Sequence, residues 1–391
     1  MARWRPQLFR RKGIEASIPE KVLSNALAVA KVTTDVKSTL PPVFSLRHLA
    51  HLVDVDYGLL RSIVTRKNQN PYRLFRIRRR PSQNGERRFR VIAVPSPGLL
   101  KTQRWITQNI LSEVTPHSAS VAFSQGDTLL AAAEPHCKCR WLIKLDVKNF
   151  FESINEIMAY RVFSSLGYQP LVSLELARIC TRLRTSSSSG THRWWVRWWQ
   201  WTTILAYQVW RGDFGSRMGH LPQGAPTSPM LANLAMREFD RRVTEIADEN
   251  GLIFTRYADD LTFSTQTSAY SRERCKKAIG QVYAVMGEFG LSPNATKTRI
   301  LTPGARKIVL GLLVDGERPK LPRDFKSTMR QHLYYLLHPN VGPVEHARNR
   351  GFSSVVGMKN HLFGLASFAA QIDKAYGDDC LSKLKKAPWP L

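Results

Sequence analysis

The chain has 391 residues, with 58 Lys and Arg against 30 Asp and Glu, a net charge of +28 and an isoelectric point near 10.3. Such an excess of positive charge repels itself unless a polyanion neutralises it, so we expect a nucleic-acid partner and binding that weakens steeply with salt. No apolar run reaches the roughly 18 residues that a membrane-spanning helix needs, which disfavours the alternative of a membrane partner.

The five cysteines lack the spacing of a disulfide framework, and no apolar signal region follows the basic N-terminus. We therefore expect free thiols and a cytoplasmic protein. His136, Cys137 and Cys139 could form half of a zinc site. Because no second Cys/His pair completes it, a structural role is favoured.

Residues 1–42 form a basic extension that we expect to contain one helix, from 19 to about 31, before Pro41 and Pro42 act as a linker. Its arginines either contact RNA phosphates or keep the segment solvated. Ser45 is the expected N-cap of the next helix, and residues 56–64 have the pattern of a further one.

Large apolar and basic residues alternate over 71–80 and 88–95, and Asn84 and Gly85 lie between, which predicts a β-hairpin. Arg88 and Arg90 belong to its basic face. A guanidinium group can hold phosphate oxygens through two hydrogen bonds, although a solvated basic face is the alternative.

After two predicted helices, over 101–113 and 128–133, an apolar run predicts a strand that contains Asp146. Two aromatic residues, Phe150 and Phe151, follow it, and the pair is equally compatible with a place in the core. Farther along, the polar stretch 185–191 leads into eight residues that hold half of the ten tryptophans.

On a helix, Trp194, Trp195, Trp198 and Trp199 share one face. This tryptophan stripe can pack as local core, dock a protein partner or stack RNA bases. Helical spacing favours packing over base stacking, and we leave the choice between core and partner open.

Residues 221–229 contain Gly and Pro residues, which let the backbone approach a ligand closely. A helix is expected from Ser228, with apolar positions as far as Phe239 on its inner face, and another over 272–290. A hairpin is predicted over 307–316, and basic helices follow it to the end of the chain.

Tyr257, Ala258, Asp259 and Asp260 lie between two apolar, β-branched runs, which predicts two strands with the aspartates at the turn. Two adjacent carboxylates alone are usually a solvated turn. Together with Asp146, however, three carboxylates at strand ends of one sheet could hold two Mg²⁺ ions about 3.5–4 Å apart for attack on a phosphate.

Three motifs, over 145–154, 221–229 and 257–260, resemble in kind and order those of bacterial reverse transcriptases, most of all the retron type. The chain departs from the retron pattern twice: the asparagine expected before His136 is absent, and Val309, Leu310 and Gly311 replace Val-Thr-Gly. The resemblance covers residues from about 43 to 391. It implies an α+β right-hand polymerase: fingers with N-terminal helices (43–140), a palm with the catalytic antiparallel sheet and a Trp-rich insertion near 185–215 (141–315), and a helical thumb (316–391).

The resemblance also implies the site. Asp146, Asp259 and Asp260 would be catalytic and, with the carbonyl of Val147, would bind two Mg²⁺ ions. Phe151 would pack under the nucleotide sugar and exclude a 2′-hydroxyl. The implied remaining contacts are Arg88 and Arg90 with the triphosphate, Gln223 and Gly224 near the incoming nucleotide, Lys297 with the leaving pyrophosphate, and Arg323, Lys326 and Arg330 with the template–primer.

The implied activity is RNA-directed DNA synthesis from deoxynucleotides. Retrons copy part of a structured non-coding RNA from a 2′-hydroxyl within it, and serve in antiphage defence, usually with an effector protein. One alternative is a reverse transcriptase of another defence system or of a group II intron; the short thumb and absent maturase extension argue against the intron. A non-catalytic RNA-binding scaffold is the alternative of a different class.

Overall fold

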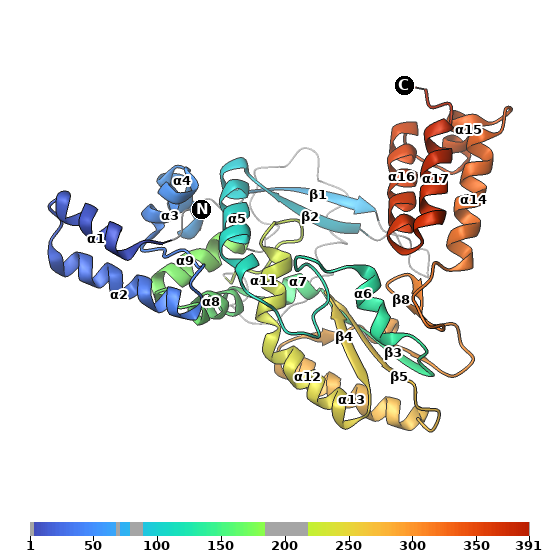
Figure 1. Ribbon diagram of the computed structural model, residues 1–391, viewed down its shortest axis with the longest axis horizontal. Helices are drawn as coiled ribbons and strands as arrows, with labels where there is room; N and C mark the ends of the chain where they lie inside the picture. Colours follow the sequence, from blue (N-terminus) through green and yellow to red (C-terminus); the bar gives the residue numbers. More distant parts are fainter. Residues whose placement is uncertain (1–3, 68–70, 79–88, 184–217, 391) are drawn as a thin grey trace.

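Helices and antiparallel strands alternate along the chain in the computed structural model, which describes residues 4–67, 71–78, 89–183 and 218–390. A helical arm, a hairpin, a central sheet and a C-terminal bundle follow one another from the blue end to the red end (Figure 1). The predicted tryptophan stripe and the hairpin tip lie outside the described residues. Among the described residues, no helix has the length and apolar content to cross a bilayer.

The central sheet has the strand order β4-β5-β3-β6, and β7 also pairs with β3. All of its pairings are antiparallel. Its strands are β3 (Trp141–Lys148), β4 (Ile253–Tyr257), β5 (Asp260–Thr265), β6 (Ser292–Pro293) and β7 (Arg299–Leu301). Since side chains alternate between the two faces of a strand, the register decides which residues share a face.

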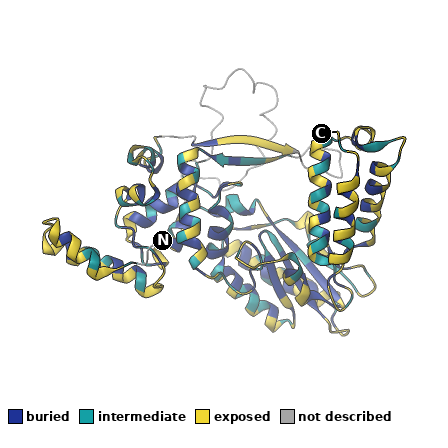
Figure 2. Ribbon diagram, turned by 45° about the horizontal axis from the view of Figure 1, so that its top comes forward, coloured by how far each residue is buried: buried dark blue, intermediate teal, exposed yellow. Residues whose placement is uncertain are grey.

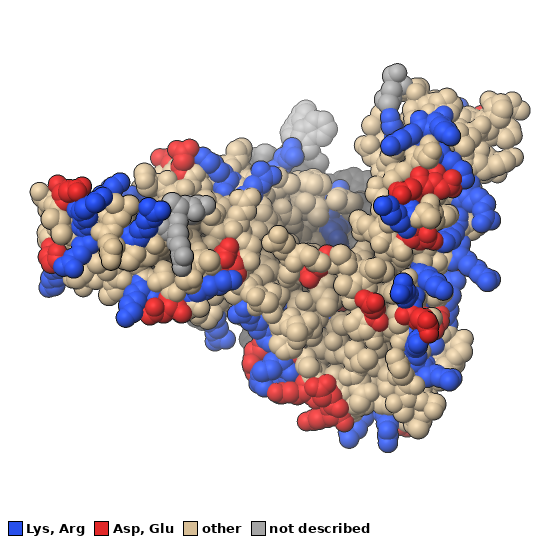
Figure 3. Space-filling model, in the orientation of Figure 1, with Lys and Arg blue, Asp and Glu red and all other residues tan. Residues whose placement is uncertain are grey.

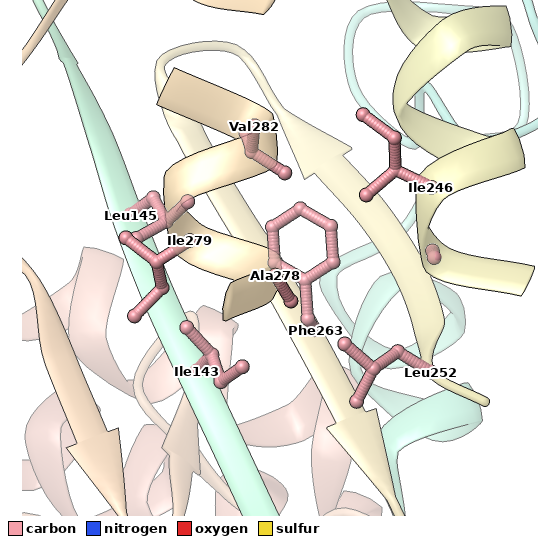
Figure 4. A pocket seen from close by; sticks show the side chains of 9 residues that line it. Ile143, Leu145, Ile246, Leu252, Phe263, Ala278, Ile279 and Val282 are labelled. Carbon is pink, nitrogen blue, oxygen red and sulfur yellow. The ribbon is translucent and has the colours of Figure 1, made fainter. Parts of the chain in front are cut away.

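One face of this sheet is apolar and is covered by α12 (Arg237–Glu249) and α13 (Arg272–Glu288). Ile143 and Leu145 on β3 lie opposite Phe263 and Leu261 on β5 and pack against these helices. Figure 4 shows a pocket between strands and helices that only apolar side chains line. This face is therefore core, and Lys144 and Asp146 of β3 lie on the other face together with Asp260 and Thr262 of β5.

The N-terminal arm consists of α1 (Pro6–Glu15) and α2 (Glu20–Val36), mostly exposed in Figure 2. The prediction of a single helix over 19–31 was wrong, because α2 runs five residues longer and α1 precedes it. Pro6 lies in the first turn of α1, where the backbone N–H that proline lacks would have no partner within the helix. The Thr33 hydroxyl donates to the carbonyl of Gly167, where an added Cβ would lie 2.9 Å from the Val32 carbonyl oxygen. The arm is thus seated on the body through a glycine.

The hairpin of β1 (Tyr72–Arg78) and β2 (Phe89–Pro95) is antiparallel, as predicted. Gln103 ties its base to the body by donating to the Tyr72 hydroxyl at 2.9 Å and to the Ile179 carbonyl at 2.8 Å. Ser45 caps its helix as predicted, whereas Asp56, expected as the first residue of the next helix, is the N-cap of that helix. The helices of this region are α3 (Leu46–Val53), α4 (Tyr57–Val64), α5 (Pro97–Asn109), α6 (Leu129–Ala133), α7 (Phe150–Ser153), α8 (Glu156–Ser165) and α9 (Pro170–Cys180).

The helix expected to run from Ser228 past Phe239 is two helices, α11 (Ser228–Ala235) and α12. The chain breaks at Met236, whose φ of −91° and ψ of 2° leave the helical region. Apolar periodicity continues across the break because both helices pack on the same core, so the pattern alone did not reveal it.

The C-terminal bundle has its own apolar core around Met329, Leu336 and Leu362. It follows the small hairpin of β8 (Ile308–Val309) and β9 (Leu312–Leu313). Lys and Arg side chains are spread over the bundle and over the N-terminal arm on the face in Figure 3. The bundle helices are α14 (Arg323–Leu337), α15 (Gly342–Asn349), α16 (Val355–Ile372) and α17 (Lys374–Lys386).

Candidate active site

The strand register brings the three aspartates together. Asp146 is the direct partner of Asp260 across β3 and β5, and the Val147 N–H donates to the Asp259 carbonyl at 2.9 Å. Asp146 and Asp260 lie on the polar face of the sheet, because their neighbours Leu145 and Leu261 face the helices. Residues more than 100 positions apart in sequence thus form one acidic site.

Asp146 is buried and is held by the segment after α13. Asn294 donates from Nδ2 to Oδ1 at 2.7 Å, and its backbone N–H donates to the Asp146 carbonyl at 2.8 Å. The ammonium of Lys297 pairs with Oδ2. These contacts keep the Asp146 carboxylate oriented, and Lys297 neutralises its charge.

Asp259 and Asp260 are half-buried and have no comparable cationic partner among their hydrogen bonds and ion pairs in the described structure. Burial raises the pKa of Asp259, and the charge of Asp146 raises it further, against smaller lowering effects of Lys297 and Arg90. Burial also raises the pKa of Asp260, with the charge of Asp259 next. Crowded carboxylates of this kind are relieved by a proton or by a cation.

The donor set fits a hard divalent cation, because carboxylate oxygens are the ligands that Mg²⁺ prefers. The present arrangement is not a closed cage: within the described ranges, no three His, Cys, Asp or Glu side chains converge as metal ligands. Asp146 is turned toward Lys297 and Asn294. A cation at this site therefore has to compete with Lys297 for Asp146.

The two phenylalanines after β3 differ in how far they are buried. Phe150 is buried, and the guanidinium of Arg256 lies 5.7 Å from its ring centroid. Phe151 is half-buried, with its ring 6.5 Å from that of Phe123, which lies 5.9 Å from the ring of Tyr257. Phe151 thus lies in an aromatic group beside the aspartate turn, while Phe150 is a core residue.

The 221–229 loop contacts both the hairpin and α7. The Gln223 amide donates to Glu152 at 2.9 Å, and its carbonyl accepts from the Ala93 N–H at 2.7 Å. Gly224 has a φ of +107°, and a Cβ there would lie 2.7 Å from Cγ2 of Ile92. Only glycine meets both conditions without strain, so this loop lies directly on β2.

The remaining residues predicted to contact the nucleotide or the template–primer differ in their exposure and in their partners. Arg90 is exposed on β2 and contributes to the electrostatic environment of Asp259, whereas Arg88 lies outside the described residues. Arg323 and Arg330 are exposed on α14. Lys326 instead pairs with Asp373 at 2.9 Å and lies over the ring of Tyr376, so it ties α14 to α17 within the bundle.

The half zinc site has a different role. His136 is buried and bonds Ser264 through Nδ1 and Thr255 through Nε2, each at 2.7 Å, so it joins β4 to β5. Burial lowers its pKa to about 4, which keeps the ring neutral. Cys137 and Cys139 are buried free thiols, as are the other three cysteines. The structural interpretation fits this arrangement.

One group beneath the site escaped sequence reasoning. Arg256, fully buried on β4, forms an ion pair with Asp240 on α12 at 2.6 Å. The only sequence signal was a single arginine within an otherwise apolar strand. Phe123, exposed and with a φ of +70°, was also not singled out.

Comparison with known proteins identifies the class. Residues 80–335 match the family described as reverse transcriptase (RNA-dependent DNA polymerase). The chain therefore belongs to the reverse transcriptase family, and it has the α+β right-hand fold of those enzymes, with the central sheet as palm and the C-terminal bundle as thumb.

The relatives define the type. The retron Ec86 reverse transcriptase of Escherichia coli is 28% identical over 347 residues, which are 88% of this chain and 95% of that protein. The retron Mx162 reverse transcriptase of Myxococcus xanthus is 27% identical over 316 residues, 78% of this chain and 59% of that protein. A solved telomerase chain from Candida albicans has a TM-score of 0.39 at 11% identity, covering 84% of this chain and 67% of that one. The protein is a retron-type reverse transcriptase, an RNA-directed DNA polymerase.

Proposed function

We propose that this enzyme copies part of a structured non-coding RNA into DNA by two-metal nucleotidyl transfer at the Asp146, Asp259 and Asp260 site. The observation that carries the proposal is the register that pairs Asp146 with Asp260. A solvated acidic turn would not need a third, buried carboxylate from another strand. Burial and the neighbouring carboxylates raise the pKa values of Asp259 and Asp260, and a bound cation would relieve this crowding of negative charge.

Each side chain has a proposed role in this reaction. Asp146 and Asp259 would hold both Mg²⁺ ions, and Asp260 and the Val147 carbonyl would support them. When bound, the ions supply activation of the primer hydroxyl and stabilisation of the pyrophosphate. Lys297, which pairs with Asp146 in the structure, would neutralise or protonate the leaving group once that pair opens.

The nucleotide is held by groups around this site. Phe151 excludes the 2′-hydroxyl, which selects deoxynucleotides. Arg90 and Arg88 contact the triphosphate, and Gln223 and Gly224 border the nucleotide. In support, the hydrogen bond from Ala93 to Gln223 connects this loop to the strand of Arg90. On the thumb, Arg323 and Arg330 contact the template–primer, whereas the ion pair of Lys326 argues for a structural part.

The wider role that we propose is supported by the relatives that carry the name retron. We infer that the template is a non-coding RNA that also supplies the priming 2′-hydroxyl, and that the enzyme works in the bacterial cytoplasm in antiphage defence with a separately encoded effector protein. The net charge of +28 supports a large RNA partner. Sequencing of nucleic acid that copurifies with the chain tests the template: a single structured RNA linked to DNA is expected, and an intron RNA would contradict it.

Primer extension on an RNA template with Mg²⁺ tests the activity and its site. We expect incorporation by the native chain and none by Asp259→Ala with Asp260→Ala. The matched control is Asp248→Ala with Glu249→Ala, which removes an adjacent acidic pair from the exposed surface of α12 and should retain full activity. Incorporation that the first double variant leaves unchanged would refute this function.

A further inference from the structure

Arg256 is a charged residue in the core. Its Cα pairs with that of Leu261, so its side chain points to the helix-covered face of the sheet, opposite to the face of Asp260. Its exposed fraction is 0%, as is that of its partner Asp240. Ions buried in this way are destabilising unless their partners satisfy them, and replacement by apolar residues is often neutral for stability. Stability alone therefore does not explain why a charged pair occupies this position.

The guanidinium group is hydrogen-bonded to three partners. Nε and Nη2 donate to the two carboxylate oxygens of Asp240 at 2.6 and 2.7 Å. Nη1 donates to Oδ1 of Asn233 at 3.3 Å and to the carbonyl of Ala258 at 3.2 Å. Asp240 and Asn233 belong to α12 and α11, so the two helices hold the guanidinium in place, and it in turn holds the backbone of Ala258.

Ala258 is the first residue of the turn between β4 and β5 and has a φ of +55°. For a residue with a Cβ this left-handed conformation is strained. The next two residues are Asp259 and Asp260, which repel each other and Asp146. Both strain and repulsion favour opening of the turn, and the hydrogen bond from Arg256 opposes this from the far side of the sheet.

We propose that the buried Arg256–Asp240 pair, with Asn233, positions the turn so that Asp259 and Asp260 face Asp146, and thereby sets the affinity of the site for divalent cations. Arg256 is a positioning residue in this scheme, because it contacts the turn and not the substrate. The inference rests on the proposed function of the three aspartates as cation ligands.

The test uses the double variant Arg256→Met with Asp240→Leu, which removes both buried charges together and keeps an apolar core. Mn²⁺ is the probe, and its binding to the full chain is followed by electron paramagnetic resonance beside steady-state primer extension. We expect a near-native Tm, at least tenfold weaker Mn²⁺ binding, at least tenfold lower kcat, and a KM for the deoxynucleotide within about twofold of native. A purely structural pair would lower Tm and leave the folded fraction with native cation affinity.

Arg256→Lys is the second variant, because it keeps the charge opposite Asp240 and so keeps the fold if the double variant loses it. A single ammonium cannot bridge Asp240, Asn233 and Ala258, so Mn²⁺ binding should again weaken. The control is Arg242→Met with Glu288→Gln, which removes an ion pair at the surface between α12 and α13, with side chains 36% and 52% exposed.

Native Mn²⁺ affinity and kcat in whichever of these Arg256 variants folds would overturn the positioning role. Failure of the proposed function is a separate result, since it would appear as absent Mn²⁺ binding or absent synthesis in the native chain itself.

Discussion

Lys297 and Asp146 form an ion pair within the acidic site, in which the Lys297 ammonium contacts Oδ2 of Asp146. Asn294 donates to the second oxygen, so both oxygens of the Asp146 carboxylate are engaged. A lysine at this place would compete with a cation for Asp146. Its release on cation binding would put a proton donor beside the leaving group, which links metal binding to the later step of the reaction.

Lys297→Met separates these two effects. Without the competing ammonium, Mn²⁺ should bind several-fold more tightly, while kcat falls by about 10²-fold through loss of the proton donor. Mn²⁺ titration and single-turnover extension measure the two quantities. Lys276→Met, an exposed lysine of α13, is the control and should change neither. Weaker Mn²⁺ binding by Lys297→Met would show that the ammonium supports the cation site instead of competing with it.

Phe151→Ala should relax sugar discrimination, because the half-buried ring beside Tyr257 and Phe123 is the proposed barrier to a 2′-hydroxyl. The measurement is the ratio of kcat/KM for a ribonucleotide to that for the matching deoxynucleotide, which should rise by at least tenfold. Phe150→Leu is the matched control: it should lower stability by roughly 1 kcal/mol without moving the ratio. A ratio that stays native in Phe151→Ala assigns the barrier to another residue.

Gly224→Ala should disturb the contact between the 221–229 loop and β2. Its Cβ would meet Ile92 at 2.7 Å and the Ala93 carbonyl oxygen at 3.1 Å, at a φ of +107°. We expect the KM for the deoxynucleotide to rise at least fivefold, since the loop and the strand of Arg90 move apart. Gly280→Ala in α13, where an added Cβ meets nothing within 4 Å, should leave KM unchanged and stabilise by about 0.5–1 kcal/mol. Equal KM values for both variants would contradict this coupling.

Cation binding should depend on pH above the ordinary carboxyl range. Burial and neighbouring carboxylates raise the pKa of Asp259 and of Asp260, so protons displace the cation at a higher pH than at an exposed aspartate, whose pKa is near 4. The stability of the metal-free protein depends on pH in the opposite sense. Deprotonation of Asp259 and Asp260 above their raised pKa values destabilises the folded state, so stability increases as the pH falls.

The rise in Tm on adding Mn²⁺ measures this linkage. It should shrink as the pH is lowered through the raised pKa values of Asp259 and Asp260, and it should be small at every pH in Asp259→Asn. A Tm increment independent of pH over this interval would show that cations bind elsewhere on the chain.

The parts of the fold that local signals determine could be predicted. Ser45 caps a helix because its side chain precedes apolar periodicity, and apolar runs around Asp146 and Asp259 mark the strands. The convergence of the three carboxylates could be predicted only from the order of the motifs. No local rule gives the register of strands that lie so far apart in the sequence.

The interactions that join distant residues could not be predicted. Arg256 and Asp240 meet only because α12 packs under β4, and His136 finds Thr255 and Ser264 only once β4 and β5 pair. The break at Met236 leaves apolar spacing intact, so periodicity misses it. Lys326 looked like an RNA contact because its partner Asp373 lies at the end of another helix.

The number of Mn²⁺ ions bound at the aspartate site tests the central claim most directly. The chain is purified with its RNA, supplied with a non-hydrolysable deoxynucleotide, and titrated with Mn²⁺ under electron paramagnetic resonance. We expect two tightly bound ions per native chain and loss of both in Asp146→Asn, the variant that removes the carboxylate contributed by β3. Two ions retained in Asp146→Asn, or none in the native chain, would contradict it.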